Sequence, residues 1–181
     1  MKGIVFTEFL EMVEQRFGLE TLDRVIIQAQ PPNDGAYTAV GTYDHQELVR
    51  LVVALSEATR VPAADLIKAF GEHLFQRFTQ TYPSLFLGVD SAFNFLRSIE
   101  HYIHVEVRKL YPDAELPAFT YESHAANQLV MLYQSRRPFA DLAEGLIRGC
   151  IDHFGENIEL QREDLESGQT NRSRFTLTQR P

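Results

Sequence analysis

The spacing of apolar residues first changes along this chain near Pro112, and this change limits the fold class. Before Pro112, apolar residues recur every three or four positions, which is typical of amphipathic helices. After it, apolar and polar residues alternate in several short segments, as they do in half-buried strands. The sequence therefore predicts an α+β protein with a helical N-terminal lobe and a C-terminal lobe that carries a sheet.

The predicted helices are marked by their apolar faces and by turn-forming residues at their ends. They cover Lys2 to Phe17, Leu22 to Ala29, a segment that begins after Asp44, Pro62 to Tyr82, Ser91 to Pro112, and Pro138 to Phe154. Asp44 is expected to cap the third helix, with Glu47 in the capping-box position. Gly18 is expected to end the first helix, since glycine is the usual residue just past a helix end.

Four segments are predicted as strands: Phe119 to Glu122, Asn127 to Arg137, Asn157 to Asp164, and Ser173 to Gln179. The last two are expected to form an antiparallel hairpin joined through Glu166, Ser167 and Gly168. We expect one four-stranded antiparallel sheet with helices against it. The chain has no internal repeat, so we expect a single domain over residues 1–181, with approximate lobes at 1–60 and 61–181.

The charge and cysteine content exclude several function classes. The net charge of −8 and the pI of about 5.2 disfavour a nucleic-acid-binding surface. The single cysteine, Cys150, permits no internal disulfide and no paired-cysteine zinc site. Neither a signal sequence nor a membrane span is recognisable, so a cytoplasmic protein is expected.

Motifs for catalysis are also missing from the sequence. There is no Gly-x-Ser-x-Gly nucleophile motif and no glycine-rich phosphate-binding loop. Cys150 lies on an apolar helical face, which indicates a small core residue rather than a nucleophile. We therefore do not expect an enzyme.

The helix predicted over Ser91 to Pro112 carries the most informative histidine. His104 follows Ile103 at the margin of an apolar stripe, where its ring can face a cavity beside the helix. A half-buried structural histidine and an axial ligand of haem iron both fit this position. The pair His101 and His104 lacks further ligands for zinc, and the Glu-x-x-His pairs of a di-iron site are absent. The remaining histidines are expected to be structural or solvated.

Tyr133, Ser135 and Arg137 alternate along a predicted strand, so their side chains share one face. A phenol, a hydroxyl and a guanidinium together make a receptor for carboxylates, and the guanidinium can form bidentate charge-assisted hydrogen bonds. Two haem propionates would suit such a receptor. A polar strand end exposed to water is the alternative interpretation.

Several motifs, in order along the whole chain, are those of one known family. They are Met1-Lys2-Gly3, His104 followed by Tyr111-Pro112, Leu116-Pro117-Ala118-Phe119, and Tyr-x-Ser-x-Arg at Tyr133, Ser135 and Arg137. The chain thus resembles the H-NOX family of bacterial stand-alone haem nitric oxide/oxygen-binding domains, which are related to the haem domain of soluble guanylate cyclase. The resemblance implies haem b held between the two lobes.

The resemblance also implies roles for individual residues. His104 would be the proximal iron ligand. Tyr133, Ser135 and Arg137 would hold the two propionates. Pro117 would press on the porphyrin face and help to distort it.

The expected distal pocket lacks a hydrogen-bond donor. The resemblance implies that Leu142 stands where oxygen-binding relatives place a distal tyrosine, and the other distal candidates, Phe9 and Leu74, are also apolar. Bound dioxygen is stabilised by such a donor, whereas nitric oxide binds ferrous haem tightly without one. We therefore expect a haem that binds NO and CO and excludes oxygen.

The resemblance further implies how the signal is passed on. Release of His104 on NO binding would free its helix and bias a two-state element. A separate histidine kinase or cyclic-di-GMP enzyme would then read the change. Two alternatives stay open: an oxygen-binding haem sensor or carrier on the same fold, and a cofactor-free interaction module.

Overall fold

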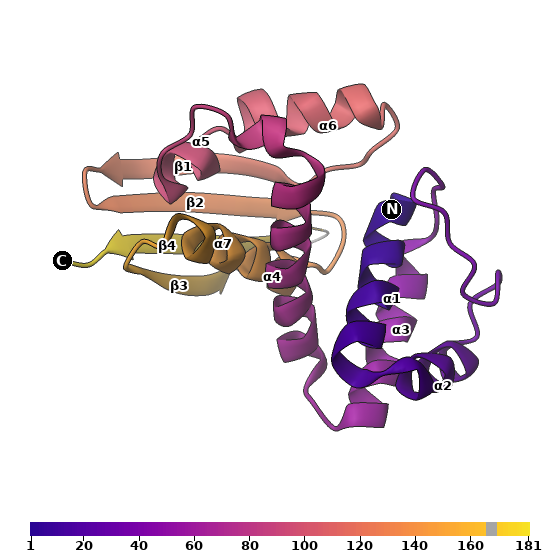
Figure 1. Cartoon of the computed structure of the whole chain (residues 1–181). Helices are drawn as coiled ribbons and strands as arrows, with labels where there is room; N and C mark the ends of the chain where they lie inside the picture. Colours follow the sequence, from indigo (N-terminus) through magenta and orange to yellow (C-terminus); the bar gives the residue numbers. More distant parts are fainter. Residues whose placement is uncertain (166–169) are drawn as a thin grey trace.

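The fold is α+β, as predicted, and is shown in Figure 1. A computed structural model describes residues 1–165 and 170–181, without the side chains of residues 123 and 124. The helices of the first half are α1 (Gly3–Phe17), α2 (Leu19–Ala29), α3 (His45–Thr59) and α4 (Ala63–Thr81), followed by the short turn η1 (Pro83–Phe86). Then come α5 (Ala92–Arg97), η2 (Ile99–Ile103), α6 (His104–Leu110), β1 (Ala118–Ala125), β2 (Gln128–Ser135), α7 (Ala140–Phe154), β3 (Ile158–Leu165) and β4 (Asn171–Gln179).

The four strands form one antiparallel sheet in the order β1-β2-β4-β3. Each lies within a few residues of its predicted range, because the alternation of apolar residues marks the buried face of a strand directly. The predicted link between β3 and β4 through Glu166, Ser167 and Gly168 lies outside the described residues. On the central strand β2, Tyr133 stands between Phe119 of β1 and Ser173 of β4.

Two hydrophobic cores meet along α4. The first fills the space between α1, α2 and α3 and takes in Leu66, Phe70 and Leu74 from α4. The second lies between the sheet, α5 and α7 and takes in Phe75 from α4. Figure 1 shows α4 standing between the helices of the N-terminal part and the sheet with α7. The predicted lobe boundary at residues 60 and 61 thus falls just before the helix that contributes to both cores.

Helices α4 and α7 cross in close backbone contact at two glycines. A Cβ atom on Gly71 would lie 2.7 Å from the Cα of Gly145, and a Cβ on Gly145 would lie 2.9 Å from the Cα of Gly71. Real Cβ atoms essentially never approach another atom that closely. The crossing therefore requires glycine on both helices.

Two local predictions need correction. Asp44 caps α3 by accepting the N–H of Gln46 at 3.0 Å, but Glu47 does not complete a capping box, because its carboxylate accepts the Tyr37 hydroxyl at 2.9 Å. The predicted helix over Ser91 to Pro112 is not one regular α-helix, since the π-helical turn η2 separates α5 from α6.

Cys150 is a fully buried free thiol, as predicted for a core residue, and burial raises the pKa of this thiol. No helix among the described residues is long and apolar enough to cross a membrane.

Candidate functional site

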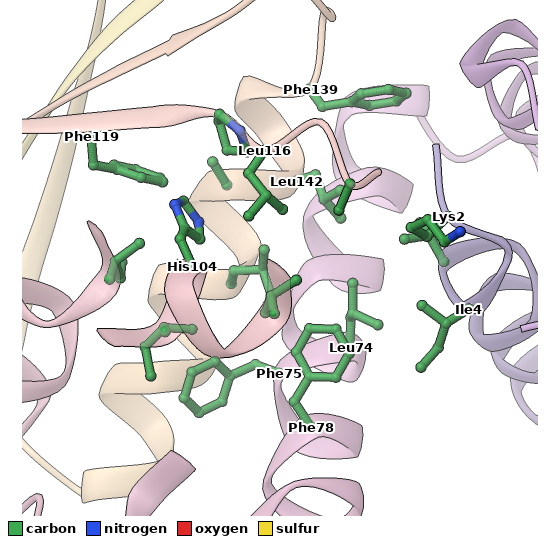
Figure 2. Close-up of a pocket in the computed structure, with 18 of the residues that line it drawn as sticks. Lys2, Ile4, Leu74, Phe75, Phe78, His104, Leu116, Phe119, Phe139 and Leu142 are labelled. Carbon is green, nitrogen blue, oxygen red and sulfur yellow. The ribbon is translucent and has the colours of Figure 1, made fainter. Parts of the chain in front are cut away.

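A cavity of about 300 Å³ lies between the start of α1 and the part of the chain that runs from α4 to α7 (Figure 2). Helices α1, α4 and α7 contribute only apolar side chains to its wall: Ile4, Val5, Leu74, Phe75, Phe78, Leu142, Ala143, Leu146 and Ile147. Polar side chains enter from Lys2 before α1, from Tyr82 after α4, from α6 and the segment before β1, and from the end of β2. A mostly apolar cavity with a few convergent polar groups is typical of a cofactor or ligand site.

His104, the first residue of α6, lines this cavity and is 7% exposed. Its ring lies beside that of Phe119, with the centroids 6.1 Å apart. In Figure 2 the His104 ring rises from its helix between Phe119 and Leu116, and Leu142 lies further along the cavity. The structure thus places His104 beside a cavity, as the sequence predicted.

The imidazole of His104 is neutral and its Nδ1 atom lacks a hydrogen bond. Burial lowers the pKa of His104 below its usual 6.5, an effect that outweighs the opposing influence of the nearby Glu100 carboxylate. Nδ1 lies 3.2 Å from Oε1 of Glu100, yet the two groups are not aligned as a hydrogen bond. A neutral imidazole is the form that binds a metal ion.

Tyr133, Ser135 and Arg137 all line the cavity at the end of β2, as their alternation predicted. The Ser135 hydroxyl accepts the backbone N–H of Arg137 at 3.0 Å. Burial raises the pKa of the Tyr133 phenol, so this group is a neutral donor. The Arg137 side chain is 17% exposed and forms an ion pair with Glu115, which also lines the cavity and is itself largely exposed.

The segment between α6 and β1 closes one side of the cavity. Leu116 and Pro117 both line it, and Figure 2 shows Leu116 projecting toward the His104 side. Lys2 ties this segment to the N-terminus of α1, because its ammonium group donates to Asp113 Oδ1 at 3.1 Å and to the Thr42 hydroxyl at 2.9 Å. The cavity wall thus joins the N-terminal residues to a segment in the middle of the chain.

The predicted distal residues are only partly brought together. Leu74 and Leu142 line the cavity, but Phe9 does not, since it is fully buried in the first core with its ring against Phe70 at 5.2 Å. Helix α1 reaches the cavity through its first turn instead, with Ile4 and Val5. The apolar stripe of α1 gave no means of telling which end of the helix faces the cavity.

These residues fit a flat, apolar group that carries a metal ion and carboxylates. Within residues 1–165 and 170–181, no cluster of three or more His, Cys, Asp or Glu side chains could hold a bare metal ion. His104 alone would suit a metal that brings its other ligands with it, as haem iron does. Arg137, Ser135 and Tyr133 supply donors for carboxylates at the cavity edge.

Comparisons with known proteins agree with this chemistry. The family described as Haem-NO-binding matches residues 2–162. The chain is similar to the Fe(II) unliganded H-NOX protein of K. algicida, with 40% identity, a TM-score of 0.92, and coverage of 100% of this chain and 97% of that one. It is similar to the Fe(II)CO H-NOX of Shewanella woodyi, solved with IWP-051 bound, at 42% identity, TM-score 0.85, and 100% and 95% coverage. A T. Tengcongensis H-NOX mutant, 23% identical with a TM-score of 0.89 over 100% and 98% of the chains, shares the fold. None of the curated proteins compared with the chain matches it.

Proposed function

The chain belongs to the Haem-NO-binding (H-NOX) family of haem-based gas sensors, and from this premise we propose that it binds haem b in the cavity and senses nitric oxide. The observation that carries the proposal is the neutral, buried His104 in a cavity whose opposite walls are apolar. When bound, the haem iron would supply the coordination site for the gas. His104 would hold the iron through its ring, and Tyr133, Ser135 and Arg137 would bind the propionates.

Selectivity for nitric oxide follows from the apolar walls. Every lining side chain from α1, α4 and α7 is apolar, so none can donate a hydrogen bond to bound dioxygen. Other donors line the cavity outside these three helices: the Tyr82 and Tyr111 hydroxyls lie 3.2 Å apart, so that one donates to the other, and the Lys2 ammonium donates to Asp113 and Thr42. Nitric oxide and carbon monoxide do not need a distal donor, so both are proposed ligands.

The proposed signal starts at His104. On NO binding, His104 would leave the iron, and α6 would lose its anchor in the cavity, while Pro117 would press less on the bound group. The same helical stretch exposes apolar surface, since Tyr102 is 37% and Val105 is 40% exposed. We propose that a separate histidine kinase or cyclic-di-GMP enzyme reads the change in this stretch, and that the chain is itself a sensor rather than an enzyme.

The first test is the visible absorption spectrum of haem-loaded, dithionite-reduced protein divided between air, CO and NO. The proposal expects no change in air, a shifted Soret band with CO, and an NO spectrum that indicates loss of the axial histidine. A stable spectrum of the oxygen complex would favour an oxygen sensor or carrier instead. Protein that takes up no haem would favour a cofactor-free interaction module.

Two variants assign the ligand. In His104→Gly, the unliganded ferrous spectrum should change and should be restored by added imidazole, because the free ring can replace the missing side chain. In the control His101→Ala, an exposed histidine is removed three positions earlier, and the spectrum should stay as in the parent protein. Equal spectra for His104→Gly and the parent would contradict the assignment.

A further inference from the structure

Glu100 has a special position relative to the proposed iron ligand. It precedes His104 by four residues, and its Oε1 atom lies 3.2 Å from Nδ1 of His104. Glu100 belongs to the π-helical turn η2, which ends directly before His104, and the His104 N–H donates to the carbonyl of Ile99, five residues earlier. Such single π turns occur frequently at functional sites.

The Glu100 carboxylate is fixed from a second direction. Its Oε1 atom accepts the backbone N–H of Phe119, the second residue of β1, at 2.7 Å. One oxygen atom therefore lies close both to the histidine ring and to the strand that faces it. An anchored carboxylate can position a ring more firmly than a free one, because less side-chain freedom is lost when the next hydrogen bond forms.

The Nδ1 atom of His104 needs such a partner. It is a buried polar atom without a hydrogen bond among the described residues, and buried polar groups are normally paired. A histidine that binds a metal through one ring nitrogen carries its proton on the other, and that N–H almost always donates to a carboxylate, a carbonyl or water. Glu100 presents the nearby carboxylate.

We propose that Glu100 is the positioning residue of the iron ligand, with its carboxylate accepting a hydrogen bond from Nδ1–H of His104 while Nε2 binds the iron. This inference rests on the proposed function, since it assumes that His104 is the ligand. The hydrogen bond would fix the ring tautomer and orientation and make the imidazole a stronger electron donor. It would thereby stabilise ferric over ferrous iron and strengthen the bond that NO must break.

Glu100→Gln tests this directly, because glutamine keeps an oxygen that can accept the Phe119 N–H but loses the negative charge. The matched control is Glu106→Gln. It removes the same charge from the same stretch of chain, where Glu106 pairs with Lys109 at 2.6 Å and does not line the cavity. The measurements are the reduction potential of the bound iron and the iron–histidine stretching frequency in resonance Raman spectra of the ferrous protein.

We expect Glu100→Gln to favour the ferrous state by about tenfold, which corresponds to a rise of about 59 mV in the potential. The iron–histidine frequency should fall, and Glu106→Gln should change both quantities much less. Equal potentials and frequencies in the two variants would overturn the proposal. A purely structural role of Glu100 at Phe119 would leave both at their parent values in Glu100→Gln.

A measurement on the unmodified protein tests the proposal even if the Glu100→Gln variant does not fold. In the ferrous, haem-loaded protein, the Nδ1 proton of His104 should give a hyperfine-shifted NMR signal that exchanges slowly with water. A rapidly exchanging proton would overturn the role of Glu100 without any substitution. If instead His104→Gly and the parent have the same iron spectrum, the proposed function fails and not merely this inference.

Discussion

Replacing Gly145 by alanine should destabilise the protein, because the backbones of α4 and α7 touch at this residue. The new Cβ would lie 2.9 Å from the Cα of Gly71 and closer still to the carbonyl oxygen of Lys68. Ordinary van der Waals contact begins near 3.4 Å. The obstacle is backbone rather than a flexible side chain, so the two helices themselves would have to move apart.

The size of the effect follows from two opposing contributions. Overpacking a core costs about 1–3 kcal/mol, and a backbone obstacle puts this site at about 3 kcal/mol. Alanine in place of glycine inside a helix recovers about 1 kcal/mol. The expected net loss is about 2 kcal/mol, and at about 2–4 °C per kcal/mol for a chain of this size, the midpoint of thermal unfolding should fall by about 4–8 °C.

The assay is thermal unfolding followed by circular dichroism, with parent and variant in the same haem-loaded state. Gly149→Ala on the same helix is the graded control, since its nearest obstacle is the Cβ of Phe75 at 2.8 Å and its nearest backbone atom lies 3.2 Å away, so the site is less tight than Gly145. Its loss should be smaller than that of Gly145→Ala. A Gly145→Ala protein as stable as the parent would refute the packing argument.

Three further predictions concern stability and cofactor retention. Burial lowers the pKa of His73 below 6.5, so the folded protein binds fewer protons there than the unfolded chain, and stability should fall as the pH drops below about 6.5. His73→Gln should lose less unfolding free energy between about pH 7 and pH 5 in denaturant titrations; an unchanged slope would contradict this. Asp44→Ala should cost about 1 kcal/mol in the same titrations, since it removes the cap of α3, and no loss would show that the cap is replaced by water. The Arg137→Gln protein should transfer its haem to apomyoglobin roughly ten- to a hundredfold faster than the parent, because charged hydrogen bonds to the propionates contribute about 1.5–3 kcal/mol. The surface variant Arg180→Gln should transfer haem at the parent rate. Equal transfer rates would argue against the propionate role.

The sequence was most informative where a repeat of two or of 3.6 residues marks a buried face. The strand predicted over Asn157 to Asp164 is β3 at Ile158–Leu165, because alternation alone sets which side chains face α7. The π-helical turn η2 could not be found in this way. One additional residue in a turn changes the hydrogen bonding of the backbone but barely disturbs the apolar repeat.

For the candidate site, too, the sequence was informative only where the pattern lies within one helix or one strand. The sequence could place His104 beside a cavity, and Tyr133, Ser135 and Arg137 on one face, because these are local properties of one helix and one strand. Phe9 lies in the first core and not in the cavity wall, because the apolar stripe runs the length of α1 and only the tertiary packing decides which end meets the cavity.

Glu100 went unrecognised as a partner of His104 for a similar reason. Its second anchor is the backbone of Phe119, and this contact exists only once β1 lies beside η2. Spacing along the helix brought Glu100 near His104, but it did not distinguish this carboxylate from Glu106.

The π-helical turn at Ile99–Ile103 gives this stretch one place where the length of the chain can change. The turn holds one residue more than a regular α-helical turn, so losing that residue would let it close into an α-helix without rotating α6. A deletion within α5 would instead turn everything beyond it by about 100° around the axis and swing His104 out of the cavity. Single-residue deletions should therefore be tolerated more readily within η2 than within α5.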